Sequence, residues 1–129
     1  MRIAKDLLGN EWEYDYMDCA IGRGSMLVPG GLIQQTDYFC VHLDPLIPLP
    51  GFLLIAPSRH IQSMTEMGES EYDELSQLVR STNMAIKQTT EIGCLTIIQE
   101  ESSPHFHLLF FPWTQSVIDR YGQPSLKKI

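Results

Sequence analysis

The stretch SSPHFHLLFFP, Ser102–Pro112, places two histidines at the start of an apolar and aromatic run. A short run of this kind after the turn-forming residues SSP predicts a β-strand from His105 onward. Alternate residues of a strand point to the same side of a sheet, so His105 and His107 are predicted to share one face, followed there by Leu109. The residues predicted to point into the core instead are Phe106, Leu108 and Phe110. A reactive edge, a metal site and a plain piece of sheet are all compatible with this pattern alone.

The rest of the chain predicts the elements around this strand. Short apolar runs between turn residues predict four further strands, at Leu32–Gln35, Tyr38–Leu43, Phe52–Pro57 and Cys94–Gln99. Apolar residues at helical spacing predict one long helix, with Ser70 as its N-cap and Gly93 at its end. Residues 2–18 predict a short helix or an irregular lead-in, and Val117–Tyr121 predicts a short helical turn. The predicted fold class is α+β, a mostly antiparallel β-sheet with one long helix and a short second helix, in a single domain over residues 1–129.

The composition narrows the class of partner. The 129 residues carry a formal net charge of −7, which argues against a nucleic-acid binder, because such a protein needs a basic surface. No apolar run approaches the ~20 residues of a membrane span, and the opening residues lack the apolar core of a signal peptide. We therefore expect a cytoplasmic protein that binds neither nucleic acid nor a membrane. A small phosphate ligand is compatible with this charge, because backbone N–H groups can hold it.

The cysteines and histidines do not define a metal site. Cys19, Cys40 and Cys94 are odd in number and irregular in spacing, so we expect free thiols rather than disulfides or a zinc quartet. Two histidines at positions i and i+2 of a strand could share a metal ion, but the ion would need one or two more ligands. His42 and His60 are possible ligands that their spacing does not single out. No metal or other cofactor is therefore predicted, and taken alone the histidine pair indicates two half-buried rings bonded to the backbone.

Several segments, in order, resemble the histidine triad family of nucleotide hydrolases and transferases. VHLDPLIPLPGFLLIAPSRHI resembles the family's strand, Asp, proline-rich loop and following strand. SSPHFHLLFFPW resembles its signature of histidines that alternate with apolar residues. DCAIGRG stands where many members carry Cys-x-x-Cys, and a long helix ending in Gly lies between the other two segments. The resemblance covers Asp18 to Trp113.

The resemblance implies a role for each matching residue. His107 would be the nucleophile that attacks the α-phosphorus and forms a nucleotidyl-histidine, since a neutral imidazole is a good nucleophile near pH 7. His105 would line the same pocket, and its backbone carbonyl would orient His107. Ser102 would bind phosphate or assist the leaving group, and Asp44 would hold the ribose hydroxyls. As structural alternatives, Asp44 could be a plain turn residue and Ser102 could cap a turn.

Other positions depart from the family's pattern. Leu109 replaces the third histidine of the triad, and Phe52 replaces an upstream histidine. Gln99 or Glu100 falls near the place where many members have Asn. His42 falls where relatives place an apolar residue beside the base, so it could stack on a ligand or lie half exposed. The predicted substrate-binding residues are Asp44, His42, Phe52 and Gln99.

Two functions from different classes follow. The intact His105, His107, Ser102 and Asp44 favour an enzyme, a nucleotide hydrolase or nucleotidyl transferase that acts through a covalent intermediate on His107. The loss of two family histidines favours a non-catalytic nucleotide-binding or interaction module on the same fold. Both hypotheses imply a small nucleotide or nucleoside phosphate as partner. We also expect a homodimer, because family members commonly pair through the long helix and an edge strand, and CLTIIQ would invite aggregation as a bare edge.

Overall fold

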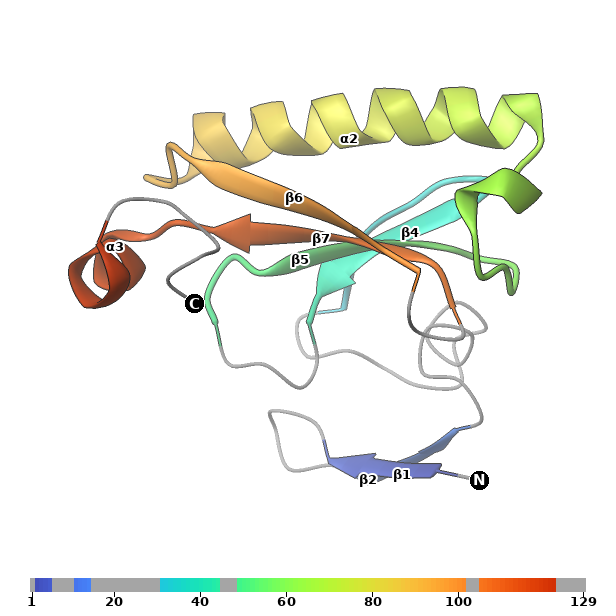
Figure 1. Ribbon diagram of the computed structural model, residues 1–129, viewed down its shortest axis with the longest axis horizontal. Coiled ribbons are helices and arrows are strands. Elements are labelled where there is room, and N and C mark those ends of the chain that lie inside the picture. Colours follow the sequence, from blue (N-terminus) through green and yellow to red (C-terminus); the bar gives the residue numbers. More distant parts are fainter. Residues whose placement is uncertain (1, 6–10, 15–30, 45–48, 102–104, 123–129) are drawn as a thin grey trace.

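The computed structural model describes residues 2–5, 11–14, 31–44, 49–101 and 105–122 (Figure 1). The strands are β1 (Arg2–Lys5), β2 (Glu11–Tyr14), β3 (Leu32–Gln35), β4 (Phe39–Leu43), β5 (Leu53–Pro57), β6 (Leu95–Glu100) and β7 (His107–Pro112). The helices are η1 (Met64–Glu66), α2 (Glu69–Thr89) and α3 (Gln115–Tyr121). Within these ranges, no helix has the length and apolar character needed to cross a membrane.

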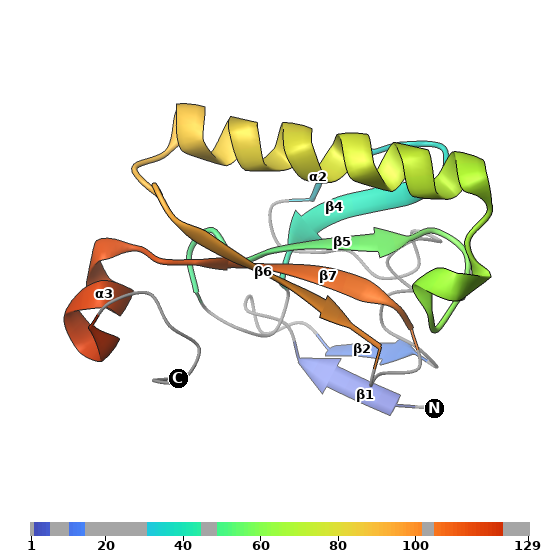
Figure 2. The same ribbon diagram turned by 45° about the horizontal axis from the view of Figure 1, so that its top comes forward.

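Five strands form one antiparallel sheet in the order β3–β4–β5–β7–β6. The long helix α2 lies across one face of this sheet (Figures 1 and 2). The predicted α+β fold class, with one long and one short helix, is therefore confirmed. The prediction for residues 2–18 is wrong, because β1 and β2 pair in a separate two-stranded antiparallel sheet on the side away from α2.

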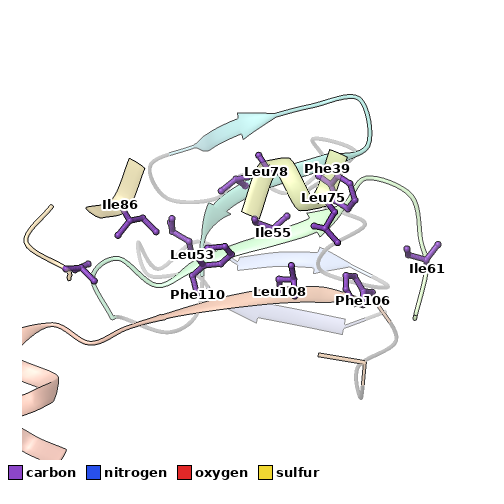
Figure 3. Close-up of a cluster of buried hydrophobic side chains, with 12 residues drawn as sticks. Phe39, Leu53, Ile55, Ile61, Leu75, Leu78, Ile86, Phe106, Leu108 and Phe110 are labelled. Atoms are coloured by element: carbon purple, nitrogen blue, oxygen red, sulfur yellow. The ribbon is translucent and has the colours of Figure 1, made fainter. Parts of the chain in front are cut away.

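The core fills the space between α2 and the sheet (Figure 3). Phe106, just before β7, and Leu108 and Phe110 within it point into the core and are at most 6% exposed, as predicted. The sheet residues that meet them from β4 and β5 are Phe39, Val41, Leu53 and Ile55. The helix residues that close the core are Leu75, Leu78 and Ile86. Because these strand residues face α2, the alternate residues of the same strands lie on the other face of the sheet.

The ends of α2 differ from the prediction. Gly68, not Ser70, is the N-cap, and the carboxylate of Glu71 accepts a hydrogen bond from the Gly68 N–H at 3.2 Å. This bond takes the place of a side-chain cap, because Glu71 reaches back to a backbone donor that the helix leaves unsatisfied. The helix ends at Thr89, four residues before the predicted Gly93, and the side chain of Thr90 donates to the carbonyl of Ile86.

An ion pair ties the start of α2 to the segment that follows β5. Arg59 donates from Nε and a terminal nitrogen to the two carboxylate oxygens of Glu71, at 2.8 to 3.2 Å. The Glu71 side chain is 10% exposed, and these bonds hold the pKa of Glu71 below its usual value. The same pair raises the pKa of Arg59. The connection fixes where the helix crosses the sheet.

A tight turn aims the start of β5. The N–H of Phe52 donates to the carbonyl of Leu49 at 3.1 Å across Pro50 and Gly51. Gly51 has φ +80°, which is the conformation that position i+2 of a type II turn requires, with proline favoured just before it. A Cβ at Gly51 would also lie 2.7 Å from Cδ1 of Ile92. Only glycine fits this turn, and the turn places Phe52 at the edge of the site.

Candidate functional site

The face of the sheet turned away from α2 carries rows of side chains that run across the strands. The middle row, set by the strand pairing, is His42, Leu54, Leu109 and Ile98. Continuing the same register gives a second row, Cys40, Ala56, His107 and Glu100, and a third, Asp44, Phe52, Phe111 and Thr96. We call these twelve positions the histidine face. The side chains on its β6 and β7 side are half-buried, and we call them the open half. Those on its β4 and β5 side are buried except for Asp44, which is half-buried, and we call them the closed half.

His107 lies in the open half with its ring held by the backbone. Nδ1 of His107 donates to the carbonyl oxygen of His105 at 3.1 Å. A carbonyl oxygen only accepts hydrogen bonds, so the proton of the neutral ring is on Nδ1 and the lone pair is on Nε2. This is the tautomer that a nucleophilic imidazole needs. The carbonyl of His105 thus contacts the ring of His107, as the family resemblance implied.

The side chain of His105 has a different environment. Strand β7 begins at His107, so the alternation expected from the sequence does not extend to His105. Nε2 of His105 donates to the carbonyl of Pro57 at 3.0 Å, and the side chain is 3% exposed. Its ring meets the exposed ring of His60 edge-on, with centroids 5.3 Å apart. His105 therefore contributes its backbone to the site more directly than its imidazole.

The predicted ligand-binding residues of β4 lie in the closed half of the histidine face. His42 is fully buried, and its Nδ1 donates to the carbonyl of Leu43 at 2.8 Å. Asp44 is half-buried, and its N–H donates to the carbonyl of Phe52 at 3.0 Å, which extends the pairing of β4 with β5 by one residue. His42 and Asp44 are two residues apart on this extended backbone and so point to the same side as His107.

The two positions where the family's histidines are replaced also lie on the histidine face. Leu109 is half-buried between Leu54 and Ile98. Phe52 is 7% exposed and meets Phe111 edge-on, with ring centroids 5.9 Å apart. These residues give the centre and one end of the face an apolar lining.

Glu100 is a residue of this face that the sequence argument did not select. It pairs with His107 across β6 and β7, whereas Gln99 pairs with Leu108. Directly opposite residues on antiparallel strands have Cβ atoms about 5 Å apart and share a face. Gln99, which was predicted to bind substrate, therefore lies on the opposite face of β6. Its side chain lines a shallow surface hollow with Tyr72.

Two residues with predicted roles lie outside the described residues. They are Ser102, expected to bind phosphate or assist the leaving group, and Cys19, expected to be a free thiol. Among the residues that the structure does describe, no group of three or more His, Cys, Asp or Glu side chains is placed to hold a metal ion.

A cavity on the other side of the sheet is separate from the histidine face. It has a volume of about 520 Å³ and lies between the C-terminal half of α2 and strands β3 and β4. Its lining is mainly apolar, with hydroxyl groups of Ser81, Thr82 and Thr89 from the helix and of Thr90 just after it. None of the twelve positions of the histidine face lines it. The chemistry-bearing side chains and the cavity are thus on opposite faces of one sheet.

The fold is shared with solved structures whose sequences are distant. A HIT family protein from Bacillus subtilis is 19% identical, with a TM-score of 0.67 over 77% of this chain and 73% of that one. A HIT family hydrolase from Legionella pneumophila Philadelphia 1 is 18% identical, with a TM-score of 0.60 over 78% and 95% of the two chains. A hypothetical histidine triad nucleotide-binding protein from Sulfolobus tokodaii strain 7 is 19% identical, with a TM-score of 0.66 over 75% and 68%.

Sequence comparison alone does not detect this similarity of fold. No protein family model matches the sequence, and no curated protein matches it either. At 18 to 19% identity the similarity is carried by the arrangement of strands and the crossing helix. The chain has the fold of the histidine triad (HIT) proteins.

Proposed function

We propose that this chain hydrolyses nucleotide phosphoesters or phosphoramidates, or transfers their nucleotidyl group, through a covalent intermediate on His107. The bond from Nδ1 of His107 to the carbonyl of His105 carries the proposal. It sets the tautomer and aims Nε2 from a ring that is only half-buried. A nucleophile needs both an unprotonated attacking atom and access to substrate, and the tautomer and partial exposure of His107 support this role.

The proposed reaction has two steps. In the first, Nε2 of His107 forms a bond to the α-phosphorus while the bond from phosphorus to the leaving atom breaks, and the leaving atom takes up a proton. In the second, water attacks phosphorus, the P–N bond breaks with its electron pair returning to Nε2, and the water gives up a proton. Nδ1 keeps its proton throughout, so the phosphorylated ring is cationic between the steps. Glu100 lies opposite this ring, and its carboxylate would stabilise the positive charge.

A nucleoside phosphate is the substrate class that the rest of the face supports. Asp44 offers carboxylate oxygens for sugar hydroxyls, and the apolar lining around Leu54 and Phe52 suits a flat base. None of the twelve positions is Lys or Arg, so the donors to phosphate on this face would be imidazole, hydroxyl and backbone N–H groups. The names of the Legionella and Sulfolobus proteins, a hydrolase and a nucleotide-binding protein, support the same class.

A second candidate function is nucleotide binding without turnover. Leu109 and Phe52 favour it, because apolar groups stand where donors could contact phosphate. A missing donor of this kind costs about 10²–10³ in rate in other enzymes. In this case the face would hold its ligand and the ring of His107 would act only as a contact.

The two candidates are separated by a turnover and trapping experiment. The wild-type chain is incubated with a fluorogenic adenosine phosphoramidate and, in parallel, with a dinucleoside polyphosphate. A reaction with labelled substrate is quenched in alkaline denaturant, because the P–N bond of a nucleotidyl-histidine breaks in acid. We expect release of the leaving group and label on His107, both absent in His107→Ala. Gln99→Ala, on the other face of β6, is the matched control and should retain activity. Binding without release or label would support the second candidate, and turnover that persists in His107→Ala would overturn the proposal.

A further inference from the structure

His42 is a buried ring with one nitrogen that has no hydrogen-bond partner among the described residues. The side chain is 0% exposed, and Nδ1 donates to the carbonyl of Leu43. Because that carbonyl only accepts, Nδ1 carries the proton, and Nε2 of the neutral ring is an acceptor. A buried acceptor that is left unsatisfied is costly, and because most buried polar groups are paired, such an atom calls for an explanation, of which a bound ligand is one.

The position of His42 relative to His107 indicates what that partner is. Both rings lie on the histidine face, two strands and one row apart. Neighbouring strands are about 4.8 Å apart and successive residues about 3.3 Å, so the two Cα atoms lie about 12 Å from each other. A nucleoside phosphate held at its phosphorus by His107 spans such a length. The far end of the ligand would then reach the closed half of the face.

The side chains around His42 indicate which part of the ligand would lie there, at the end away from the phosphorus. Its neighbour in the row is Leu54, and Cys40 lies two residues before it on the same face; all three side chains are buried. A single acceptor among apolar groups suits a flat aromatic ring that presents one N–H donor at its edge. Sugar hydroxyls have a better partner in the carboxylate of Asp44, which accepts on two oxygens.

We propose that Nε2 of His42 accepts a hydrogen bond from the amino group of a nucleobase, so that the site selects bases with this donor over bases without it. The inference rests on the proposed function, because it assumes that His107 holds the phosphorus. Since His42 has no exposed surface, binding requires a local rearrangement around it. The residue acts on specificity and takes no part in the bond-making steps.

The test compares two ligands that differ only in this donor. Adenosine 5′-monophosphate and purine riboside 5′-monophosphate, which lacks the amino group, are titrated into the full chain by calorimetry. We expect the wild type to bind the adenine compound about ten- to hundredfold more tightly, because a site with an unmet acceptor rejects a ligand that cannot satisfy it. The ¹⁵N resonance of Nε2 in His42 should shift with the adenine compound only.

The variant His42→Phe keeps a flat ring and removes the acceptor. We expect it to bind both ligands with equal affinity and to melt no lower than the wild type, since an unsatisfied buried group is lost. Equal affinity of the wild type for both ligands would overturn this inference and leave the proposed function standing. Failure of the wild type to bind either ligand would overturn both. The wild-type comparison decides the question even if the variant does not fold.

Discussion

Glu100 and His107 lie directly opposite each other in the β6–β7 ladder, on the face of the sheet turned away from α2. Backbone pairing of this kind holds the two Cβ atoms about 5 Å apart. If His107 carries a nucleotidyl group, its ring becomes a cation next to an acidic residue. Among the described residues, Glu100 is therefore placed to influence the chemistry of His107.

The first prediction concerns this pair. A carboxylate attracts a neighbouring cationic ring, and exposure to water weakens this attraction for a half-buried pair. We expect Glu100→Gln to lower the turnover rate about tenfold with little change in KM. Steady-state kinetics on the fluorogenic substrate measures both. The neighbouring Gln99→Ala, which faces the other way, should leave the rate unchanged, and an equal loss in both variants would point to damage to β6 rather than to a role in the reaction.

The pairing of Glu100 with His107 shows what could and could not be predicted from the sequence. The alternation in β7 predicted its core face correctly, because Phe106, Leu108 and Phe110 are strongly apolar. The choice between Gln99 and Glu100 depended on the register between β6 and β7. Register is a tertiary property, and a shift of one residue moves a side chain to the other face. Nothing in a single sequence fixes that offset.

Two misjudged elements have local physical reasons. Residues 2–18 were expected to form a short helix or an irregular lead-in, but they include β1 and β2. Strands of four residues give too little alternation to be recognised from the sequence. The start of α2 differs from the prediction because Gly68 has no side chain that marks it as an N-cap in the sequence. Its N–H donates instead to the carboxylate of Glu71, inside the helix.

The second prediction concerns the turn before β5. Gly51→Ala should destabilise the protein by about 1–3 kcal/mol, because a Cβ is strained at φ +80° and would meet Ile92 at 2.7 Å. Urea denaturation followed by circular dichroism measures the loss. Gly93→Ala is the control, since a Cβ there has no heavy atom within 4 Å. Unchanged stability of Gly51→Ala would show that the turn adopts another conformation.

The third prediction follows from the ion pair between Arg59 and Glu71. Hydrogen bonds from Arg59 lower the pKa of Glu71, so the folded state binds a proton there less readily than the unfolded chain does. The stabilisation is therefore complete above the usual Glu value of about 4.3 and is lost as pH falls through the lower pKa of the folded protein. We expect Glu71→Gln to cost about 1–2 kcal/mol at pH 7, discounted because Arg59 is half exposed.

This difference should shrink as the pH falls below about 4. Urea titrations of wild type and Glu71→Gln at pH 7, 5 and 3.5 give the three values. Glu69→Gln, an exposed position in the same first turn of α2, serves as the control. A gap between wild type and Glu71→Gln that stays constant across these pH values would mean that the charge of Glu71 contributes nothing.

The fourth prediction is the homodimer. Strand β6 is an edge of the five-stranded sheet, and Ile97 on it is 40% exposed. Edge strands of this kind are normally paired, covered or charged. We expect two copies to pair through β6, so that sedimentation velocity at micromolar concentration gives about twice the 14.7 kDa of one chain. Ile97→Lys should shift the population toward monomer, and a wild-type monomer at that concentration would contradict the prediction.

The fifth prediction restores a histidine at the centre of the histidine face. Residue 109 follows His107 by two positions on β7, so Leu109→His would place an imidazole in the same open half. One donor to a developing phosphate charge is worth about 2.7–4 kcal/mol in a site that excludes water. An imidazole without a hydrogen-bond partner between Leu54 and Ile98 would cost about 1–3 kcal/mol, which opposes this gain. We expect turnover to rise, with the gain limited by that cost.

Its natural companion is Phe52→His, which breaks the edge contact with Phe111 and brings a second polar ring to the same face. If the two new imidazoles contact each other or a shared phosphate, the double variant should gain more than the two single variants together. Steady-state kinetics on wild type and the three variants gives the coupling. Gln99→His, on the opposite side of β6, controls for the addition of an imidazole that cannot reach the substrate. If all variants fold and none has a higher turnover rate than the wild type, the apolar centre of the face is not a weakened phosphate site. Leu109 and Phe52 would then serve to recognise a ligand that the protein binds without turning it over.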